Sequence, residues 1–284
     1  MLIGQFYGTS AAEGIPAPFC RCDTCCQARE NPALQRLRTC FRLTDTMMID
    51  LGADAVSQSM RYGDLQQVEH ILVTHTHDDH LNPHMMMEAF WSRAQRKPLH
   101  YYFTDKAFDI VDKWRQSDWI LKGMVPKWEA EGIVVFHKLE YGKRYEIDGI
   151  GVIPFRGNHM GNVGEHSALY LLELPDGHTL FYGLDSGPYF SETLSALKGV
   201  HIDIFVSEAT MGTAGKHGMG QHMDIEDVCN LITALYAQGT VDADSFLYLT
   251  HINHSTTHTQ LLSAVAALPF PLRTTVCIDG MKIL

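Results

Sequence analysis

Short apolar runs alternate with amphipathic segments along the chain and predict most of its secondary structure. Runs of apolar and β-branched residues that are bounded by glycine, proline or polar positions indicate buried strands. Such runs occupy residues 47–50, 70–74, 99–103, 133–139, 151–155, 168–174, 179–182, 202–206, 246–249 and 274–278. We predict a strand at each of them.

Four further segments have the periodicity of amphipathic helices. Residues 84–97 and 106–119 are the first two, and residues 260–267 form a last helix that stops before a proline. The remaining helix begins at Asp224, a residue type that caps helix N-termini, and ends near Gly239. Its apolar face consists of Ile225, Val228, Leu231, Ile232 and Leu235.

The order of these elements predicts the fold class. Strands that pair as a meander come first, and strands interleaved with helices follow. This order favours an α/β protein with an αβ/βα sandwich, in which two mixed β-sheets lie face to face with helices outside. Because no repeat, low-complexity segment or linker interrupts the chain, we expect residues 1–284 to form one domain.

Composition bears mainly on the partners of the protein. Hydrophobic residues make up 45% and charged residues 19% of the chain, as in ordinary soluble proteins. The net charge is −11 and no run of Lys or Arg exceeds two, which argues against a broad nucleic-acid surface. A small anionic substrate remains compatible, because metal ions can supply positive charge locally. The sequence leaves open whether the chain forms a homodimer.

The N-terminal segment and the cysteines bear on the compartment. The first residues contain neither a basic segment nor a long apolar stretch, so they do not resemble a signal peptide. No apolar run approaches the length of a membrane span. The seven cysteines, four of them within residues 20–26, do not look like a disulfide framework. We therefore expect a reduced, cytoplasmic protein that does not bind membranes.

The most informative stretch is THTHDDH at residues 74–80, which directly follows a predicted strand. His75 and His77 alternate, so in an extended backbone their imidazoles share one face. Asp79 and His80 follow where the chain can turn back towards a second metal, and two metals commonly clamp an attacking and a leaving oxygen. The stretch therefore predicts a metal centre.

Three other predicted strands also lead to a potential metal ligand. His159 follows the strand at 151–155, Asp185 follows the one at 179–182, and His251 follows the one at 246–249. Such ligands are expected to converge at one edge of the sheet together with the loop at 74–80.

The pattern HxHxDH at residues 75–80 resembles the signature of the metallo-β-lactamase superfamily, and the later motifs occur in the expected order. The resemblance implies the metallo-β-lactamase fold. It implies that His75, His77 and His159 bind one metal, that Asp79, His80 and His251 bind a second, and that Asp185 bridges the two. His166 competes for the third position at the first metal, and we prefer His159 because it directly follows a strand-like run.

Imidazole and carboxylate ligands suit Zn²⁺ best, while ligand type also allows Mn²⁺ or Fe²⁺ in this centre. Asp50 and Asp78 are candidates to accept hydrogen bonds from the N–H groups of the ligand imidazoles.

A second cluster of candidate ligands lies near the N-terminus. The thiolates of Cys20, Cys22 and Cys25 can wrap one tetrahedral zinc, which needs a fourth ligand from elsewhere. Cys26 follows too closely to join the same geometry. The other cysteines lie in apolar surroundings and are predicted to be core residues, namely Cys40, Cys229 and Cys277.

CxCxxC ahead of HxHxDH resembles a narrower subgroup, the cyclic phosphodiesterase of the bacterial carbon–phosphorus lyase pathway and its relatives. That resemblance implies a structural zinc in a loop at residues 20–25, with His254, three residues after His251, as the fourth ligand. The segment 160–164 looks longer here than in this close relative, and the loops around Trp91 and Met211 do not obviously match it, so the substrate is expected to differ.

Phosphodiester hydrolysis usually needs an acid that protonates the leaving alkoxide. Glu208-Ala209-Thr210 and the later His222 resemble the Glu-Ala-Thr plus histidine arrangement of phosphodiesterases, including the tRNA 3′-end ribonucleases. By this likeness His222 is the acid and Glu208 orients it, with Asp79 beside them in the reacting centre. His217 is close in sequence and competes for the role of acid.

The leading prediction is therefore a metal-dependent hydrolase, a dinuclear phosphodiesterase that acts on a small, cyclic phosphate ester. One alternative is hydrolysis of an ester, lactone or thioester, which needs the same ligands but not the pair Glu208 and His222. A tRNA 3′-processing nuclease is a further alternative, which the acidic charge disfavours. The last is a non-enzymatic metal-binding regulatory domain, which has no chemical need for the complete ligand set.

Overall fold

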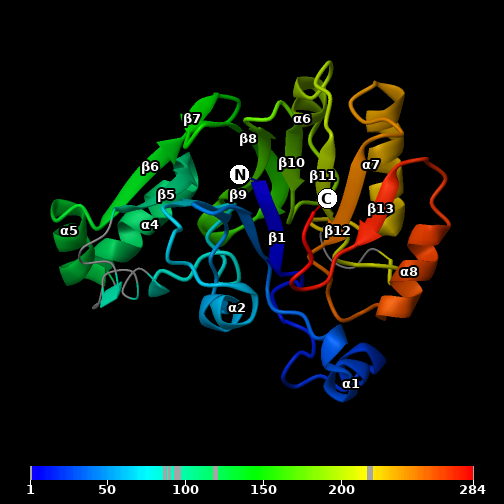
Figure 1. Ribbon diagram of the computed structural model, residues 1–284, viewed down its shortest axis with the longest axis horizontal. Helices are drawn as coiled ribbons and strands as arrows, with labels where there is room; N and C mark the ends of the chain where they lie inside the picture. The colour runs from blue at the N-terminus through cyan, green and yellow to red at the C-terminus, as the bar shows by residue number, and fades with distance from the viewer. Residues whose placement is uncertain are drawn as a thin grey trace.

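The computed structural model describes residues 2–85, 88, 91–92, 97–117, 121–215 and 220–283. The chain folds into two β-sheets packed face to face, with helices on the outer face of each sheet (Figure 1). This arrangement is the αβ/βα sandwich that the order of elements predicts, and the predicted fold class is confirmed.

The first sheet contains six strands in sequential order. They are β1 (Leu2–Gly8), β2 (Cys40–Thr44), β3 (Met47–Ile49), β4 (His70–Leu72), β5 (Leu99–Thr104) and β6 (Val134–Leu139). The strands from β1 to β3 pair antiparallel, and those from β3 to β6 pair parallel. The sheet is therefore a meander followed by crossover connections.

The second sheet repeats this change of direction with seven strands in the order β13 to β7. They are β7 (Tyr145–Ile147), β8 (Ile150–Met160), β9 (His166–Glu173), β10 (Thr179–Gly183), β11 (Ile204–Glu208), β12 (Phe246–Thr250) and β13 (Arg273–Val276). Pairing is antiparallel from β7 to β10 and parallel from β10 to β13. The strands β8, β10 and β12 consequently run in the same direction and end at the same edge.

Helices accompany the two sheets in the described part of the chain. They are α1 (Asp23–Glu30), α2 (Ala55–Tyr62), α4 (Asp105–Ser117), α5 (Leu121–Ala130), α6 (Ser191–Ala196), α7 (Ile225–Ala237) and α8 (His258–Ala266). In Figure 1, α4 and α5 lie on the side of the first sheet and α7 and α8 on the side of the second. Among the described residues, the structure has no helix with the length and apolar character needed to cross a bilayer.

The alternation of side chains along the strands explains why both faces of each sheet are covered. In β9, Ala168, Tyr170 and Leu172 point into the core between the sheets, and Leu169 and Leu171 point into the core under the outer helices. A strand with two buried faces reads as a continuous apolar run rather than an alternating one. This is the pattern by which the sequence predicts β9.

Each of the ten predicted strands overlaps an observed one, whereas β1, β2, β7 and the helices α1, α2, α5 and α6 were not predicted. In β2 the polar Arg42 interrupts the apolar run by which a buried strand is predicted. It is nevertheless buried, and it donates to the hydroxyl of Tyr7 (2.9 Å) and the carbonyl of Asp64 (2.9 Å). Much of the helix predicted at 84–97, and residues 118–119 of the next, lie outside the described residues.

Candidate metal centre

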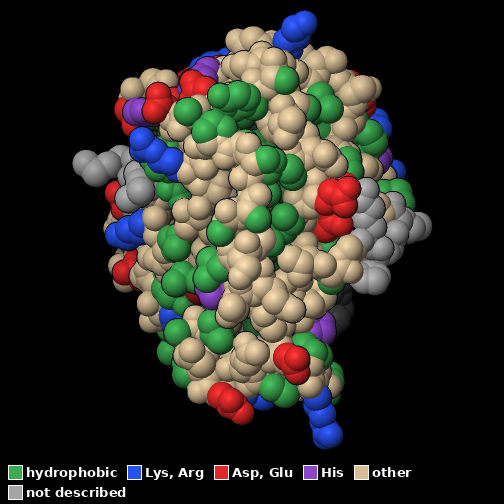
Figure 2. Space-filling view, turned by 90° about the vertical axis from the view of Figure 1, so that its right-hand side faces the viewer, with side chains coloured by type: hydrophobic (Ala, Val, Ile, Leu, Met, Phe, Trp, Pro, Cys, Tyr) green, Lys and Arg blue, Asp and Glu red, His purple; other side chains and the backbone are tan. Residues whose placement is uncertain are grey.

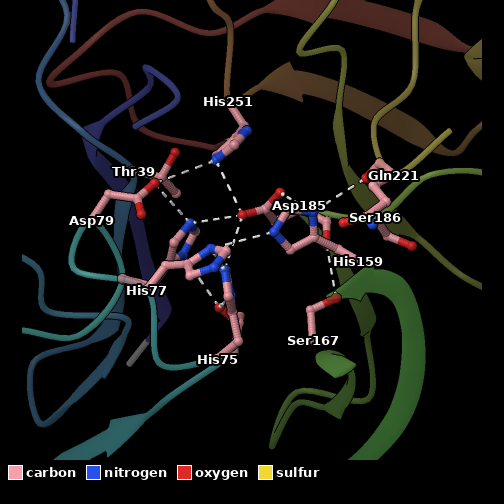
Figure 3. Close-up of polar contacts among 12 residues, drawn as sticks. Thr39, His75, His77, Asp79, His159, Ser167, Asp185, Ser186, Gln221 and His251 are labelled. Atoms are coloured by element: carbon pink, nitrogen blue, oxygen red, sulfur yellow. Dashed lines mark hydrogen bonds and ion pairs between the residues drawn. The ribbon is translucent and has the colours of Figure 1, made fainter. Parts of the chain in front are cut away.

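The candidate metal centre lies at the edge of the sandwich where β4, β8, β10 and β12 end. The loop after β4 carries the HxHxDH motif, Asp185 follows β10 and His251 follows β12. His159 is part of β8, because that strand continues past the predicted end at residue 155, with a register irregularity between Arg156 and Met160. Figure 3 shows these side chains pointing towards one another around Asp185.

Four side chains form a first group whose candidate ligand atoms all lie within 4.8 Å of one another, namely His75, His77, His159 and Asp185. His77 Nδ1 is 2.9 Å from His75 Nε2 and 3.4 Å from His159 Nε2. Asp185 Oδ2 is 3.3 Å from His75 Nε2. The structure thus brings together the residues that the superfamily resemblance assigns to the first metal.

A second group with the same spacing contains Asp79, His80, Asp185 and His251. His80 Nε2 is 3.2 Å from Asp79 Oδ2 and 3.0 Å from Asp185 Oδ2. His251 Nε2 is 3.6 Å from Asp185 Oδ2. Asp185 belongs to both groups, which is the position that a bridging carboxylate requires.

His166, the alternative to His159, lies away from this edge of ligand atoms. Its Nδ1 is 3.1 Å from the carbonyl oxygen of Gly157, and its ring packs edge-on against Phe190 with centroids 5.6 Å apart. Within the described chain, His166 belongs to neither group. The geometry therefore favours His159.

The donor atoms of the second group fit a cation. His80 Nε2, His251 Nε2 and Asp185 Oδ1 are buried and form no hydrogen bond, although buried polar atoms are normally paired. Burial opposes the charge of Asp185, yet the surrounding imidazoles, His251 first, hold its pKa well below the usual value. Burial also opposes the charge of His80, but Asp79, Asp50 and Asp185 together outweigh burial and raise the pKa of His80 well above its usual value. Divalent ions among these atoms would satisfy both the orphaned nitrogens and the buried carboxylates.

Neighbouring side chains fix the orientation of the histidines. Asp50 Oδ2 is 2.6 Å from His80 Nδ1, and its Oδ1 accepts a 2.8 Å hydrogen bond from the Thr74 N–H. Asp78, the other predicted acceptor, is exposed, and its backbone carbonyl accepts a hydrogen bond from the Ala53 N–H. The prediction for Asp50 agrees with its contact, whereas Asp78 faces solvent because the loop turns outward at that residue.

Three residues of this region have a backbone conformation that side chains rarely adopt. The φ angles are 62° at Asp50, 50° at Asp185 and 56° at His251. Left-handed conformations of non-glycine residues cost free energy and cluster at functional sites, where the surrounding structure holds them. The strand ends are therefore bent to aim these side chains inward.

His222 and Glu208 lie beside the two groups. His222 Nδ1 is 3.2 Å from Glu208 Oε2 and 3.2 Å from Asp185 Oδ1. Burial disfavours the charged imidazole, but the nearby carboxylates, Glu208 first and then Asp185, together outweigh burial and raise the pKa of His222 to about 9. His217, the alternative acid, lies outside the described residues. His222 can thus carry a proton at neutral pH.

Thr210 was not singled out by sequence reasoning, although it follows Glu208 in the same short motif. Its hydroxyl donates to Glu208 Oε2, and its oxygen lies 2.8 Å from His251 Nδ1. Glu208 Oε1 also accepts a 2.7 Å hydrogen bond from the Ser186 N–H. Thr210 therefore connects the orienting carboxylate of the acid to a candidate metal ligand.

The N-terminal cysteines form a separate group with His254, again with all candidate ligand atoms within 4.8 Å. His254 Nδ1 is 3.1 Å from Cys20 Sγ and 3.4 Å from Cys22 Sγ. Cys25 is buried, and its sulfur accepts a hydrogen bond from the Ala17 N–H. This set of three sulfurs and one nitrogen fits the tetrahedral preference of zinc.

The remaining cysteines have no common role. Cys26 is exposed and lies 3.5 Å from the carbonyl of Arg21. Cys40 and Cys277 are buried in the core as predicted, whereas Cys229 is only partly buried because its position on α7 lies at the margin of the apolar face.

Comparisons with known proteins agree with this geometry. The family described as beta-lactamase superfamily domain matches residues 45–252. No curated protein matches the chain. Among solved structures, the chain is similar to a diphosphatase from the PhnP family, with 18% identity and a TM-score of 0.71 over 100% of this chain and 98% of that one.

Two further structures show the same fold. The Zn²⁺-bound PqqB from Methylobacterium extorquens has 15% identity and a TM-score of 0.73, with 99% of both chains covered. The short form of human tRNase Z has 16% identity and a TM-score of 0.62, with 99% of this chain and 98% of that one covered. At these identities the likeness shows the fold, whereas the match of the family model to residues 45–252 confirms the predicted superfamily.

Proposed function

The chain belongs to the beta-lactamase superfamily, and on that premise we propose that it is a dinuclear metal phosphodiesterase that acts on small phosphate esters, cyclic diesters above all. The observation that carries the proposal is the pair Glu208 and His222 directly beside the two groups of candidate ligands. Hydrolysis of an ester, lactone or thioester uses the same ligands but has no need of an acid in this place.

We propose that the active-site metals bind the seven side chains described above, with Zn²⁺ as the preferred ion. They are His75, His77 and His159 at the first metal, Asp79, His80 and His251 at the second, and Asp185 between the two. When bound, such a pair of ions neutralises the phosphate and lowers the pKa of an attacking water to about 7.

The chain's own residues then supply orientation and a proton. Glu208 accepts from the Nδ1–H of His222, which leaves the Nε2–H of a protonated His222 to donate to the leaving alkoxide. The Ser186 N–H and the Thr210 hydroxyl hold the Glu208 carboxylate in place. A protonated His222 carries an N–H at both ring nitrogens, and its raised pKa supports this charge state.

The cysteine group supports a second proposal, a structural zinc held by Cys20, Cys22, Cys25 and His254. It would join the N-terminal loop to the segment after β12, so that residues 1–284 form one hydrolase domain. Three sulfurs and one imidazole leave no open position for a substrate, as is typical of structural zinc.

A tRNA-processing nuclease has the support of the fold likeness to human tRNase Z. The charge distribution argues against it. The net charge is −11, and the face over α7 and α8 shows scattered hydrophobic side chains with Lys and Arg only towards its edges (Figure 2). A small substrate is the better match, because phosphate-backbone binding depends on clustered basic side chains.

A substrate panel tests the proposal. The metal-loaded protein is assayed on bis-p-nitrophenyl phosphate, cyclic nucleotides, a carboxylic ester, a lactone and a β-lactam. We expect turnover of the phosphodiesters and almost none of the β-lactam. Preference for the ester or lactone by a wide margin in kcat/KM would replace the phosphodiesterase proposal by the alternative on the same fold.

A further inference from the structure

The residue between the first two candidate ligands, Thr76, is fixed by hydrogen bonds at all of its polar groups. Its N–H donates to Glu165 Oε1 (2.7 Å), and its hydroxyl donates to the same oxygen. Its carbonyl oxygen accepts from Asn162 Nδ2 at 2.6 Å. Because His75 and His77 flank Thr76, the peptide that sets their spacing is held from outside the motif.

Both partners of Thr76 belong to the short connection between β8 and β9. This connection is built around the Glu165 side chain. Glu165 Oε1 also accepts from the Asn162 N–H (3.1 Å), and the Gly161 N–H donates to the Glu165 carbonyl (3.0 Å). A Cβ at Gly161 would lie 2.4 Å from Glu165 Oε1, and Val163 has φ 52°. A strained β-branched residue and a close-fitting glycine are features that the surrounding structure must hold in place.

The burial of Glu165 needs an explanation beyond closing a turn. Its relative exposure is 0%, and its second oxygen, Oε2, forms no hydrogen bond. Burying a carboxylate is costly even when part of it is bonded, and an apolar side chain could fill the same space at a lower cost, but it could not accept the three hydrogen bonds that Oε1 accepts. Within the described chain, Glu165 belongs to none of the groups of candidate metal ligands, and its hydrogen bonds to the HxHxDH segment are those with Thr76.

We propose that Glu165 is a positioning residue that sets the spacing of His75 and His77 for the first metal. The inference rests on the proposed dinuclear centre. Glu165 does not touch a ligand imidazole in this arrangement; it fixes the intervening peptide through Thr76, as residues around metal ligands commonly do at one remove. Glu165 directly follows residues 160–164, the segment that is expected from the sequence to be longer than in the close relative.

The test is a Co²⁺ titration followed by visible absorption and by competition with a chelator. Thiolate-to-cobalt charge-transfer bands report the cysteine group separately and serve as an internal control. A His77→Ala variant identifies the step that belongs to the first metal. We expect Glu165→Ala to lower the Co²⁺ affinity of the first metal site by roughly 10–100-fold and to leave the thiolate bands unchanged.

Two conservative variants separate positioning from charge. Glu165→Gln keeps an oxygen that can accept from the Thr76 and Asn162 N–H groups. The Co²⁺ affinity of its first metal site should therefore remain close to that of the wild type. Thr76→Val removes only the hydroxyl and should weaken the first step less than Glu165→Ala does. Combining Thr76→Val with Glu165→Ala should add little further loss, because both break the same contact.

The control Glu192→Ala removes an exposed carboxylate 3.9 Å from Arg156 and should bind Co²⁺ as the wild type does. If Glu165→Ala and Thr76→Val both leave the first step unchanged, the inference is wrong, whatever they do to stability. Equal damage by Glu165→Gln and Glu165→Ala would also overturn it, in favour of a role for the charge. If the wild type itself fails to bind two Co²⁺ ions outside the cysteine group, it is the proposed function that fails.

Discussion

The histidine–aspartate centre and the cysteine–histidine cluster meet in the short segment after β12, where His251 belongs to the first and His254 to the second. The two differ in burial. In the centre, His75, His80 and His251 are at most 1% exposed, whereas Cys20, Cys22 and His254 are only partly buried. A cation is thus shielded from water in one case and close to the surface in the other.

They differ also in how the chain holds the ligands. The ends of strands from both sheets supply the centre, with a left-handed backbone at Asp185 and His251. The cysteine cluster uses one loop and the start of α1, where Cys22 is the N-cap residue and makes no capping hydrogen bond. By contrast, the helix that follows His222 is capped by Asp224, whose side chain accepts from the Asp227 N–H.

The difference indicates a division of labour. Buried ligands on strained strand ends are held by the surrounding structure, which suits catalysis. The Cys22 sulfur makes no capping hydrogen bond, and a thiolate at this position would gain from the positive end of the helix dipole. The cluster joins residues 234 positions apart in sequence, so its expected contribution is to stability.

The largest effect that would separate the two clusters is expected from His251→Ala. Removing this imidazole takes a ligand from the second metal and the partner of the Thr210 oxygen. Turnover should be abolished and the metal content should fall by about one ion per chain, while the cysteine-bound zinc remains. Elemental analysis with a thiol-titration assay measures both. Loss of the cysteine-bound zinc from this variant would contradict the separation of the clusters.

A smaller effect, confined to the centre, is expected from His222→Ala. For a poor leaving group, kcat should fall by roughly 10²–10⁴, because the departing alkoxide loses its proton donor. With p-nitrophenolate the loss should be much smaller, since this group leaves without a proton. Steady-state kinetics on a pair of diesters that differ only in the leaving group provide the measurement. Equal losses for both would leave His222 as a residue that orients the substrate.

The pH profile should show a still smaller effect of the same residue. A general acid must be protonated, and although burial opposes the charge, Glu208 and Asp185 together raise the pKa of His222 from 6.5 to about 9. His222 is therefore protonated at neutral pH. Turnover of a poor leaving group should fall as the pH rises through about 9 and His222 loses its proton. A cation bound to Asp185 would reduce the contribution of this carboxylate to the raised pKa of His222. The fall in turnover would then occur at a lower pH. A profile that keeps rising above pH 9, with no difference in His222→Ala, would argue against the acid.

The sequence predicts the central strands of the sandwich better than its edge strands and short helices. The strands β9, β10 and β12 are buried on both faces and read as apolar runs, so their pattern is unambiguous. The edge strands β1 and β7 and the short helix α6 depend on tertiary contacts for their stability, and such contacts leave little periodic signal. The sequence does not indicate α1, because its cysteines resemble a loop of metal ligands rather than the start of a helix.

The candidate centre is predictable to the extent that its residues follow strands or occur in a motif. The structure places all seven predicted ligands close together, and its geometry favours His159 over His166 because β8 continues through residue 159. Thr210 belongs to the Glu-Ala-Thr motif, but its contact with His251 is not visible in the sequence. Glu165 occurs in no motif and contacts the centre through hydrogen bonds to a distant segment. Glu165 lies 89 positions from Thr76, and no spacing rule connects them.

The smallest effect on turnover is expected from His254→Ala, the variant that tests the cysteine cluster. Three thiolates leave one tetrahedral position open, and His254 Nδ1 is the group that faces it. Without it the zinc should be lost, and the loss of a link worth about 2–4 kcal/mol should lower Tm by about 5–10 °C. The folded fraction should keep its kcat, because the buried centre keeps every ligand.

The matched control is His178→Ala, which removes an exposed histidine that pairs with Asp176 and contacts neither cluster. Its Tm and zinc content should equal those of the wild type. Calorimetry and metal analysis on both variants complete the comparison with His251→Ala. The assignment of the two histidines is wrong if His254→Ala empties the buried centre and keeps the cysteine-bound zinc, because the three-residue spacing would then point the two imidazoles the other way.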